Sequence, residues 1–214
     1  MVITNASDFR QAFSVSRETV EKIEIYGEKI RTWQKAVNLV APKTLDDIWH
    51  RHFADSAQLL PLIPPAIKSL ADFGSGGGFP GLVLAICLQD LRPEIKISLV
   101  ESDQRKAAFL RDVAGAVDNP VQILSTRIED DATKREIGAV DLISARALAP
   151  LDRLLGLIFP FCHESTVCLF PKGRSVEDEM TRARVRWSFD VAHVESRTDC
   201  SGRIAILRDV QPSP

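Results

Sequence analysis

Short apolar runs alternate with helical stretches along the second two thirds of this 214-residue chain. The apolar runs fall at residues 70–73, 95–101, 121–124, 140–144 and 166–170, and helical stretches lie between most of them, at 80–89, 103–116 and 150–160. Buried strands that alternate with amphipathic helices form a parallel sheet covered on both faces. The pattern therefore predicts an α/β fold.

The end of the chain departs from this alternation. Residues 187–197 and 203–208 are both strand-like, and residues 199–202 lie between them, which predicts a hairpin. A mostly parallel sheet that ends in an antiparallel hairpin differs from the usual dinucleotide-binding arrangement. The expected architecture is a Rossmann-like sheet with an antiparallel C-terminal hairpin.

The first third of the chain has a helical period instead. Apolar residues step by three, four or seven positions along one face: Val20, Ile23, Ile30, Trp33 and Val37. A capping box at Thr44 should start another helix, which continues over residues 50–60 and ends at Pro61. We therefore expect an N-terminal helical subdomain over residues 1–67 and the main α/β domain over residues 68–214.

Residues 71–81, ADFGSGGGFPG, hold five glycines within eight positions. They follow a strand that ends at Phe73 and precede a helix that begins near Pro80, a residue type that suits a first helical turn. The helix N-terminus presents free N–H groups, and glycine lets a ligand approach the backbone. We interpret the stretch as a cofactor loop at the carboxyl end of the first strand. The alternative is a tight turn that only packs the helix against the sheet.

Two cofactors fit the glycine spacing. G-x-G-x-x-G at residues 76–81 matches the dinucleotide fingerprint, whereas G-x-G-x-G at 74–78, preceded by Asp72, matches the S-adenosylmethionine loop of class I methyltransferases. The second strand ends in Glu101, whose carboxylate can accept hydrogen bonds from the ribose of either cofactor, unless it is only a solvated carboxylate. The C-terminal hairpin favours the methyltransferase spacing.

More selective motifs are spread over most of the chain. They are Trp33, Asn38-Leu39, Arg51-His52-Phe53-x-Asp55-Ser56, Asp72-x-Gly74-Ser75-Gly76-x-Gly78-Phe79-Pro80-Gly81, Glu101, Lys106, Phe109-Leu110, Ser144-Ala145-Arg146-Ala147 and Lys172-Gly173. With these motifs the chain resembles the bacterial 16S ribosomal RNA (guanine-N7) methyltransferase family, once named for glucose-inhibited division. The resemblance implies a class I S-adenosylmethionine-dependent methyltransferase that acts on the small ribosomal subunit.

The resemblance also implies cofactor contacts at Gly74, Phe79, Ile128, Glu129 and Arg146. Together with the loop and the second strand end, the predicted cofactor site consists of Gly74, Gly76, Gly78, Phe79, Glu101, Ile128, Glu129 and Arg146. An apolar residue at 128 can pack on adenine while a polar group beside it meets the purine edge; the alternative for Glu129 is an acid at a helix start. Arg146 follows the fourth strand, where its planar fork can hold a carboxylate or phosphate and position the reactants; the alternative is a surface ion pair.

The expected reaction explains which catalytic groups are missing. Guanine N7 has an exposed lone pair and no proton, so methyl transfer needs in-line approach and no general base. We expect no nucleophilic cysteine, because Cys162 and Cys168 lie in apolar runs. We expect no metal, because no ligand set completes the histidines at 50 and 52. His52 and Asp55 are three residues apart on a predicted helix, which indicates an orienting pair or a plain surface contact.

Basic residues near the predicted site indicate RNA binding. Lys172 and Arg174 follow the fifth strand at the same sheet edge as Arg146, and Arg51 and His52 lie in the N-terminal part. A basic rim of this kind contacts phosphates without reading sequence. The formal net charge of −2 and the single tyrosine argue against binding of short single strands. The predicted partner is therefore 16S rRNA folded within the 30S subunit.

Compartment and assembly are predicted from absences. The four cysteines have no C-x-x-C spacing, which indicates reduced thiols in the cytoplasm. The N-terminus lacks the pattern of a secretory signal, and no apolar stretch approaches the roughly 18 residues of a membrane span. We expect a cytoplasmic protein, a monomer with no obligate protein partner.

Two other classes of function remain as alternatives. A nicotinamide-dependent oxidoreductase would use the glycine spacing at 76–81, but the chain has no convincing Tyr-x-x-x-Lys or His-Asp proton relay. A non-enzymatic regulator could bind S-adenosylmethionine or RNA. The presence of the cofactor loop together with Glu101 and Arg146 argues against that second class.

Overall fold

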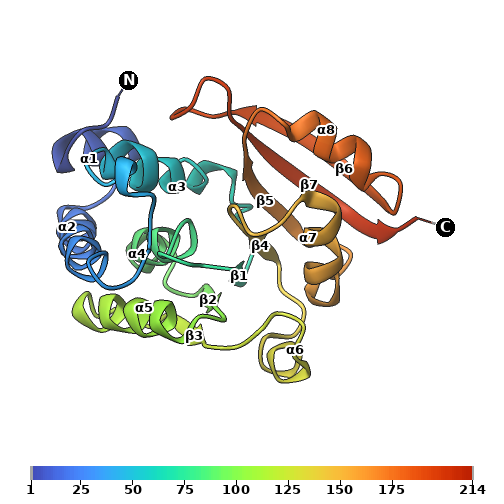
Figure 1. The fold of residues 1–214 in the computed structure, drawn as a ribbon, viewed down its shortest axis with the longest axis horizontal. Coiled ribbons are helices and arrows are strands. Elements are labelled where there is room, and N and C mark those ends of the chain that lie inside the picture. The colour runs from blue at the N-terminus through green and yellow to red at the C-terminus, as the bar shows by residue number, and fades with distance from the viewer. Residues whose placement is uncertain (1, 214) are drawn as a thin grey trace.

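A seven-stranded sheet forms the centre of the computed structural model, which describes residues 2–213 (Figure 1). Its strands are β1 (Ser69–Phe73), β2 (Lys96–Val100), β3 (Gln122–Leu124), β4 (Leu142–Ser144), β5 (Val167–Lys172), β6 (Trp187–Glu195) and β7 (Arg203–Pro212). Their order in the sheet is β3-β2-β1-β4-β5-β7-β6. Strands β1 to β5 pair in parallel, whereas β7 is antiparallel to both β5 and β6. The predicted α/β architecture with an antiparallel C-terminal hairpin is confirmed.

Helices cover both faces of this sheet (Figure 1). They are α1 (Ala6–Phe13), α2 (Arg17–Trp33), α3 (Asp55–Ala57), α4 (Gly81–Leu91), α5 (Gln104–Ala116), α6 (Asp131–Ile137), α7 (Leu151–Ile158) and α8 (Val176–Ala183). Because side chains alternate along a strand, Ala71 and Phe73 of β1 pack in the core with α7, while Leu70 packs with α4 on the opposite face. None of the helices within residues 2–213 is both long and apolar enough to cross a membrane.

The segment between α2 and β1 is less regular than its sequence predicts. It contains short 3-10 turns η1 (Pro42–Thr44) and η3 (Leu60–Leu62), a π-helix η2 (Trp49–Ala54) and the single turn α3. A helix is present over much of the expected range 50–60, but most of it is π-helical. The predicted cap is wrong, because the Thr44 hydroxyl donates to the Ala41 carbonyl and contacts His52 instead of capping a helix. π-Helical turns are frequent at functional sites, and this one carries His52.

The N-terminal helices share one core with the α/β part. Tyr26 of α2 is fully buried, stacks on Phe79 with ring centroids 5.5 Å apart, and lies 6.1 Å from the ring of Phe109 in α5. Its hydroxyl donates a hydrogen bond to the Gly77 carbonyl. The secondary structure changes near residue 67, where we predict the division, but the hydrophobic core is continuous across it. Helix α2 contacts the glycine loop directly through Tyr26.

Candidate active site

The glycine loop that follows β1 has a backbone that favours glycine at three positions. Gly74, Gly76 and Gly78 have φ angles of 69°, 56° and 90°, in the left-handed region. The loop is tied to the end of β2, because the Gly74 amide donates to the Val100 carbonyl at 2.9 Å. The Gly76 amide donates to the Glu101 carboxylate at 2.7 Å. These bonds fix the loop above the carboxyl ends of β1 and β2.

Packing within the protein accounts for four of the five glycines. A Cβ added at Gly74 would lie 2.6 Å from Leu148 Cδ1, at Gly77 2.9 Å from the Leu39 carbonyl, at Gly78 against the Tyr26 hydroxyl, and at Gly81 2.5 Å from Asp72 Cβ. Only at Gly76 is the nearest atom as far as 3.8 Å. The sequence interpretation, which assigned the glycine density to ligand approach, is therefore incomplete. Most of the glycines are required by contacts with other parts of the chain, and Gly76 alone faces open space.

Two carboxylates lie beneath this loop. Glu101 is 7% exposed, and its two oxygens accept from the Gly76 and Asp103 amides, both at 2.7 Å. Asp72 is fully buried; its Oδ1 accepts from the Ser144 hydroxyl at 2.6 Å, and its Oδ2 has no hydrogen-bond partner among the described residues. Burial raises the pKa of Asp72 to about 6. An unpartnered buried carboxylate oxygen calls for a ligand or a solvent donor.

The other predicted cofactor residues lie at the same edge of the sheet or near it. Ile128 and Glu129 follow β3, as predicted; Ile128 is buried in the core with Val100, and Glu129 is exposed. Phe79 is only 4% exposed and packs between Tyr26 and Phe53. Gly78 is likewise buried. Gly74 and Gly76 are the two half-buried glycines among 74, 76, 77 and 78, and only Gly76 has open space beside it, so the loop surface available to a ligand is centred on Gly76.

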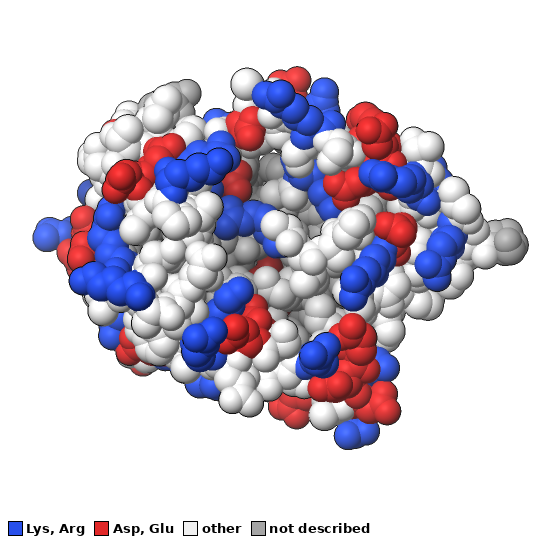
Figure 2. Space-filling model, viewed as in Figure 1, with Lys and Arg blue, Asp and Glu red and all other residues white. Residues whose placement is uncertain are grey.

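A cavity of about 660 Å³ opens beside this loop, at the carboxyl ends of β4 and β5. Five segments line it: the irregular turns from Thr44 to Gln58, residues 146–150 after β4, the end of β5, helix α8, and the β6–β7 loop with the start of β7. Figure 2 shows a hollow near the middle of this face, with basic and acidic side chains intermixed around it. Leu148 both lines the cavity and lies against Gly74, so it stands between the cavity and the loop.

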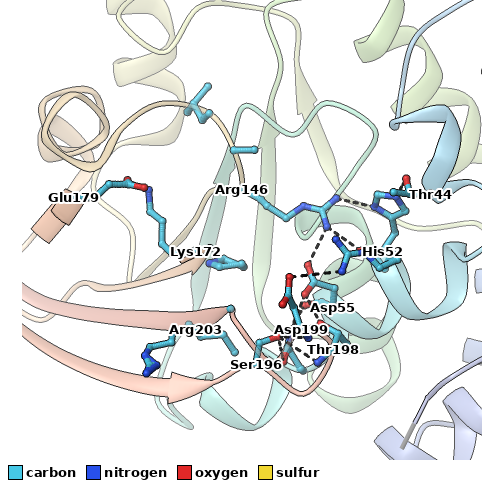
Figure 3. A pocket seen from close by; sticks show the side chains of 18 of the residues that line it. Thr44, His52, Asp55, Arg146, Lys172, Glu179, Ser196, Thr198, Asp199 and Arg203 are labelled. Atoms are coloured by element: carbon cyan, nitrogen blue, oxygen red, sulfur yellow. Dashed lines mark hydrogen bonds and ion pairs between the residues drawn. The ribbon is translucent and has the colours of Figure 1, made fainter. Parts of the chain in front are cut away.

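Arg146 forms hydrogen bonds with two other side chains that line the cavity (Figure 3). Its Nη1 donates to Asp55 Oδ2 at 3.0 Å, and its Nη2 donates to His52 Nδ1 at 3.1 Å. The guanidinium carbon lies 5.1 Å from the ring centroid of Phe79, within cation–π distance. Arg146 therefore joins the N-terminal turns, the glycine loop and β4 at one point. The predicted link between His52 and Asp55 is indirect, since each of them contacts Arg146.

The hydrogen bonds fix the protonation of His52. The Thr44 hydroxyl donates its only proton to the Ala41 carbonyl at 2.8 Å, so it must accept from His52 Nε2 at 2.7 Å. His52 Nδ1 is then free to accept from Arg146. Burial, with a further contribution from the Arg146 charge, lowers the pKa of His52 to about 3. His52 is consequently neutral at physiological pH, 8% exposed, and bonded through both ring nitrogens.

The cations predicted to bind RNA differ in how free they are. Lys172 forms an ion pair with Glu179 at 2.8 Å, and only 11% of the lysine side chain is exposed. Arg51 is exposed and pairs loosely with Asp199 at 3.7 Å. Arg174 is exposed and forms no ion pair with any described residue. The rim of the cavity is thus mixed in charge, where the sequence predicts a basic one.

Sequence reasoning missed the contribution of the β6–β7 loop. The Thr198 hydroxyl donates to Asp55 Oδ1 at 2.6 Å, and Gln58 contacts both Asp55 and Ser196. No local pattern in a hairpin loop signals such a contact over more than 140 residues. The one usable signal is the motif around Asp55, which indicates the residue that Thr198 contacts but not the β6–β7 loop itself. No group of three or more metal-binding side chains comes together within residues 2–213.

Known proteins were compared with this chain. The family model GidB, rRNA small subunit methyltransferase G, matches residues 19–207. The ribosomal RNA small subunit methyltransferase G of Rhodospirillum centenum is 49% identical over 97% of this chain and 92% of its own length. The protein of the same name from Paramagnetospirillum magneticum is 48% identical, over 92% of this chain and 91% of its own length. A TehB-like SAM-dependent methyltransferase from Corynebacterium glutamicum superposes with a TM-score of 0.57 at 13% identity, covering 85% of this chain and 98% of that one.

The sheet order, and the glycine loop at the carboxyl edge of the sheet, give this chain the class I methyltransferase fold. The match over residues 19–207 and the two relatives narrow this class to one family. The chain belongs to the GidB family of rRNA small subunit methyltransferases, and the predicted family and enzyme class are confirmed.

Proposed function

We propose that this enzyme transfers a methyl group from S-adenosylmethionine to N7 of a guanine in 16S ribosomal RNA. Membership of the small subunit methyltransferase family supports the ribosomal substrate. The observation that supports this chemistry is the position of Arg146, whose guanidinium donates to a neutral His52 and to the carboxylate of Asp55. This arrangement suits a reaction that needs positioned reactants and no proton transfer.

The loop residues fit S-adenosylmethionine. Gly76 offers open space beside its backbone, the Glu101 oxygens keep lone pairs for ribose hydroxyls, and Asp72 Oδ2 has no donor within residues 2–213. Ile128 and Glu129 lie past β3, where they would meet the adenine. When bound, this cofactor supplies an electrophilic methyl group on a positively charged sulfur. The side chains beneath the loop would hold it, and Phe79 would support the loop from inside the core.

The cavity beside the loop fits one extruded nucleotide. Its volume of about 660 Å³ lies within the usual range for small-molecule sites, about 300–1,000 Å³. A base in a folded RNA must leave its stack before an enzyme can work on its ring atoms. In this proposal the guanine enters the cavity beside Arg146, and Leu148 lies between it and the glycine loop.

Arg146 is the residue proposed to position the reacting pair. A guanidinium has five N–H donors, and His52, Asp55 and the Arg51 carbonyl leave part of this set unused. The remaining donors can hold the guanine or a phosphate by a charge-assisted hydrogen bond. His52 cannot serve as a base while Nδ1 accepts from Arg146 and Nε2 carries a proton. A base-free transfer at N7 is consistent with these constraints.

The wider partner and location are also proposals. We propose that the enzyme acts as a monomer in the cytoplasm on the assembled 30S subunit, with Arg51, Lys172 and Arg174 near the RNA backbone. The net charge of −2 and the mixed rim give little non-specific attraction to RNA. Recognition then depends on the folded surface of the particle.

The test is a methylation assay on purified 30S subunits. The protein is incubated with S-adenosylmethionine and subunits from cells that lack it, and the RNA is digested to nucleosides for mass spectrometry. We expect 7-methylguanosine, at a single site in a cleavage map of 16S RNA. Methylation at another atom of guanine would overturn the N7 assignment. Binding of NAD in preference to S-adenosylmethionine, measured by calorimetric titration, would overturn the cofactor.

A further inference from the structure

We propose that Thr198, in the loop between β6 and β7, is a positioning residue that fixes Arg146 through the carboxylate of Asp55. The inference rests on the proposed function, since Arg146 is the group that it positions. It assigns the C-terminal hairpin a part in methyl transfer. Figure 3 shows the three side chains meeting on one side of the cavity.

One carboxylate connects the loop to the arginine. Thr198 Oγ1 donates to Asp55 Oδ1 at 2.6 Å, and Asp55 Oδ2 accepts from Arg146 Nη1 at 3.0 Å. Gln58 Nε2 also donates to Oδ1, at 2.9 Å. The carboxylate of Asp55 is 19% exposed and the Arg146 side chain 21%, so water weakens this pair less than it would at an open surface. The orientation of the carboxylate therefore depends on donors at both of its oxygens.

The loop is held firmly enough to serve as an anchor. The Ser196 hydroxyl oxygen accepts from the amides of Thr198 and Asp199, both at 3.2 Å. The Arg197 amide donates to Gln58 Oε1 at 2.8 Å, which ties the loop to the N-terminal turns. The Thr198 hydroxyl is thus presented to Asp55 from a fixed backbone. A swinging side chain on a free loop could not orient the carboxylate in this way.

His52 alone cannot replace this anchor. It is a neutral acceptor for Arg146 Nη2, whereas Asp55 carries a negative charge and forms an ion pair with Nη1, so both partners of that bond are charged. If Oδ1 loses the Thr198 donor, the carboxylate can rotate about its own bond, and Nη1 of Arg146 follows it. Phe79 restrains the guanidinium only by contact with a ring face. The expected result is a displaced Arg146 in a cavity that is otherwise intact.

The substitution that tests this link is Thr198→Val, which keeps the side-chain shape and removes the hydroxyl. A misplacement of about 1 Å can cost up to about 100-fold in rate, and the retained Gln58 bond should limit the loss to about tenfold. We expect the single-turnover rate constant at saturating 30S subunits and cofactor to fall by about that factor. The dissociation constant for S-adenosylmethionine should stay within about twofold, because Thr198 does not contact the glycine loop. Thr198→Ser restores the donor and should recover most of the rate.

A control and a second readout separate positioning from a general loss of structure. Thr32→Val removes a hydroxyl that bonds only to the Glu28 carbonyl on an exposed helix surface, and it should leave the rate unchanged. The Arg146 side-chain N–H signals in NMR, identified with Arg146→Lys, should shift in Thr198→Val and return in Thr198→Ser, without any substrate. Unchanged Arg146 signals in Thr198→Val would overturn the proposal. So would a lowered melting temperature with an unchanged rate.

The two readouts also distinguish this inference from the proposed function. If the unsubstituted enzyme makes no 7-methylguanosine, the proposed function fails, and the NMR shifts still report whether Thr198 orients Arg146. If the enzyme makes that product and Thr198→Val works at the full rate, the proposed function stands and the positioning role fails.

Discussion

The glycine loop and the Arg146 cavity are neighbours, yet the chain builds them by opposite means. The loop comes from one contiguous stretch, residues 74–81, and acts mainly through backbone atoms. The cavity draws on five segments between residues 44 and 204 and acts through charged and polar side chains. Steric packing determines which residues the loop can contain, since an added Cβ would collide at four of its five glycines. The cavity depends on ion pairs, since each of the three carboxylates that line it, on Asp55, Glu179 and Asp199, pairs with a cation.

This difference predicts two kinds of failure. In the loop, a wrong residue should act through steric overlap and reduce stability or close the space for the cofactor. In the cavity, a wrong residue should leave the fold nearly intact and misplace a charge. Pairs of substitutions within each region test whether these two kinds of failure are distinct.

The largest effect is expected within the loop, from Gly78→Val. A side chain at this position meets the Tyr26 hydroxyl and adopts a φ of 90°, so overpacking and left-handed strain add. The two together should lower the free energy of unfolding by about 2–5 kcal/mol. Urea unfolding, followed by fluorescence, measures the change.

Gly76→Val is the matched control for this change. It shares the left-handed φ but has no atom within 3.8 Å of the added Cβ, so the strain alone should cost about 1–2 kcal/mol. Its affinity for S-adenosylmethionine should instead weaken by at least about tenfold, or about 1.4 kcal/mol. If the two variants proved equally stable, packing would not be the reason for glycine at 78.

The second prediction concerns the cavity. Arg146→Ala removes the residue that spans His52, Asp55 and Phe79, and should lower the single-turnover rate by about 100-fold, or about 2.7 kcal/mol. Its affinity for S-adenosylmethionine should change less than that of Gly76→Val. Rapid-quench methyl transfer on 30S subunits gives the rate, and calorimetry gives the affinity.

His52→Gln is the comparison for this variant. An amide oxygen can still accept from Arg146, so the rate should fall by less than in Arg146→Ala. Because the His52 pKa of about 3 keeps the ring neutral, the rate of the unsubstituted enzyme should be nearly flat over roughly pH 6.5–9. A steep rise with pH that disappears in His52→Gln would show that His52 is a general base.

The same contrast explains how much the sequence could predict. The strands were predicted because buried apolar runs carry a local signal, and the position of the loop was predicted because glycines at the end of a strand carry another. Arg146 was predicted from a motif. The long-range contacts that hold it in place were not, because a hydrogen bond such as that from Thr198 to Asp55 joins residues 143 positions apart and leaves no periodic pattern in the sequence. Thr44 was misread as a helix cap, because its local pattern also suits the bond to His52 that the fold provides.

A third prediction uses the pH dependence of stability to compare the two regions. The pKa of His52 falls to about 3, so below its usual value of 6.5 the unfolded chain takes up the proton and stability decreases as pH falls. The pKa of Asp72 rises to about 6, so between its usual value of 3.8 and pH 6 the folded chain takes up the proton and stability decreases as pH rises. Over about pH 4–6 the two contributions oppose each other.

Removing either group should therefore tilt the stability profile in opposite directions. Relative to the unsubstituted protein, His52→Gln should lose stability as pH rises from 4 to 6, and Asp72→Asn should gain it. The expected slope is at most about 1.4 kcal/mol per pH unit for each group. Urea unfolding at half-unit intervals of pH measures both slopes. If the profile of either variant ran parallel to that of the unsubstituted protein, the group that this variant lacks would have its ordinary pKa in the folded chain.

The smallest effect is expected at the rim, where Arg174 and Lys172 form a matched pair on the same strand end. Arg174 is exposed and unpaired within the described chain, so Arg174→Ala should weaken 30S binding only a few-fold and reduce the salt slope by about one phosphate contact. Lys172 is held by Glu179, which also accepts from the Leu151 amide, so Lys172→Ala leaves a carboxylate without its counter-ion. That variant should lose stability, by about 1–3 kcal/mol, with a smaller change in salt slope. Filter binding between 50 and 200 mM salt, beside urea unfolding, separates the two effects. Lys172→Ala could instead reduce the salt slope as much as Arg174→Ala and keep full stability. Lys172 would then exchange Glu179 for an RNA phosphate, and the arrangement of charges in the cavity would depend on the bound RNA more than on ion pairs within the protein.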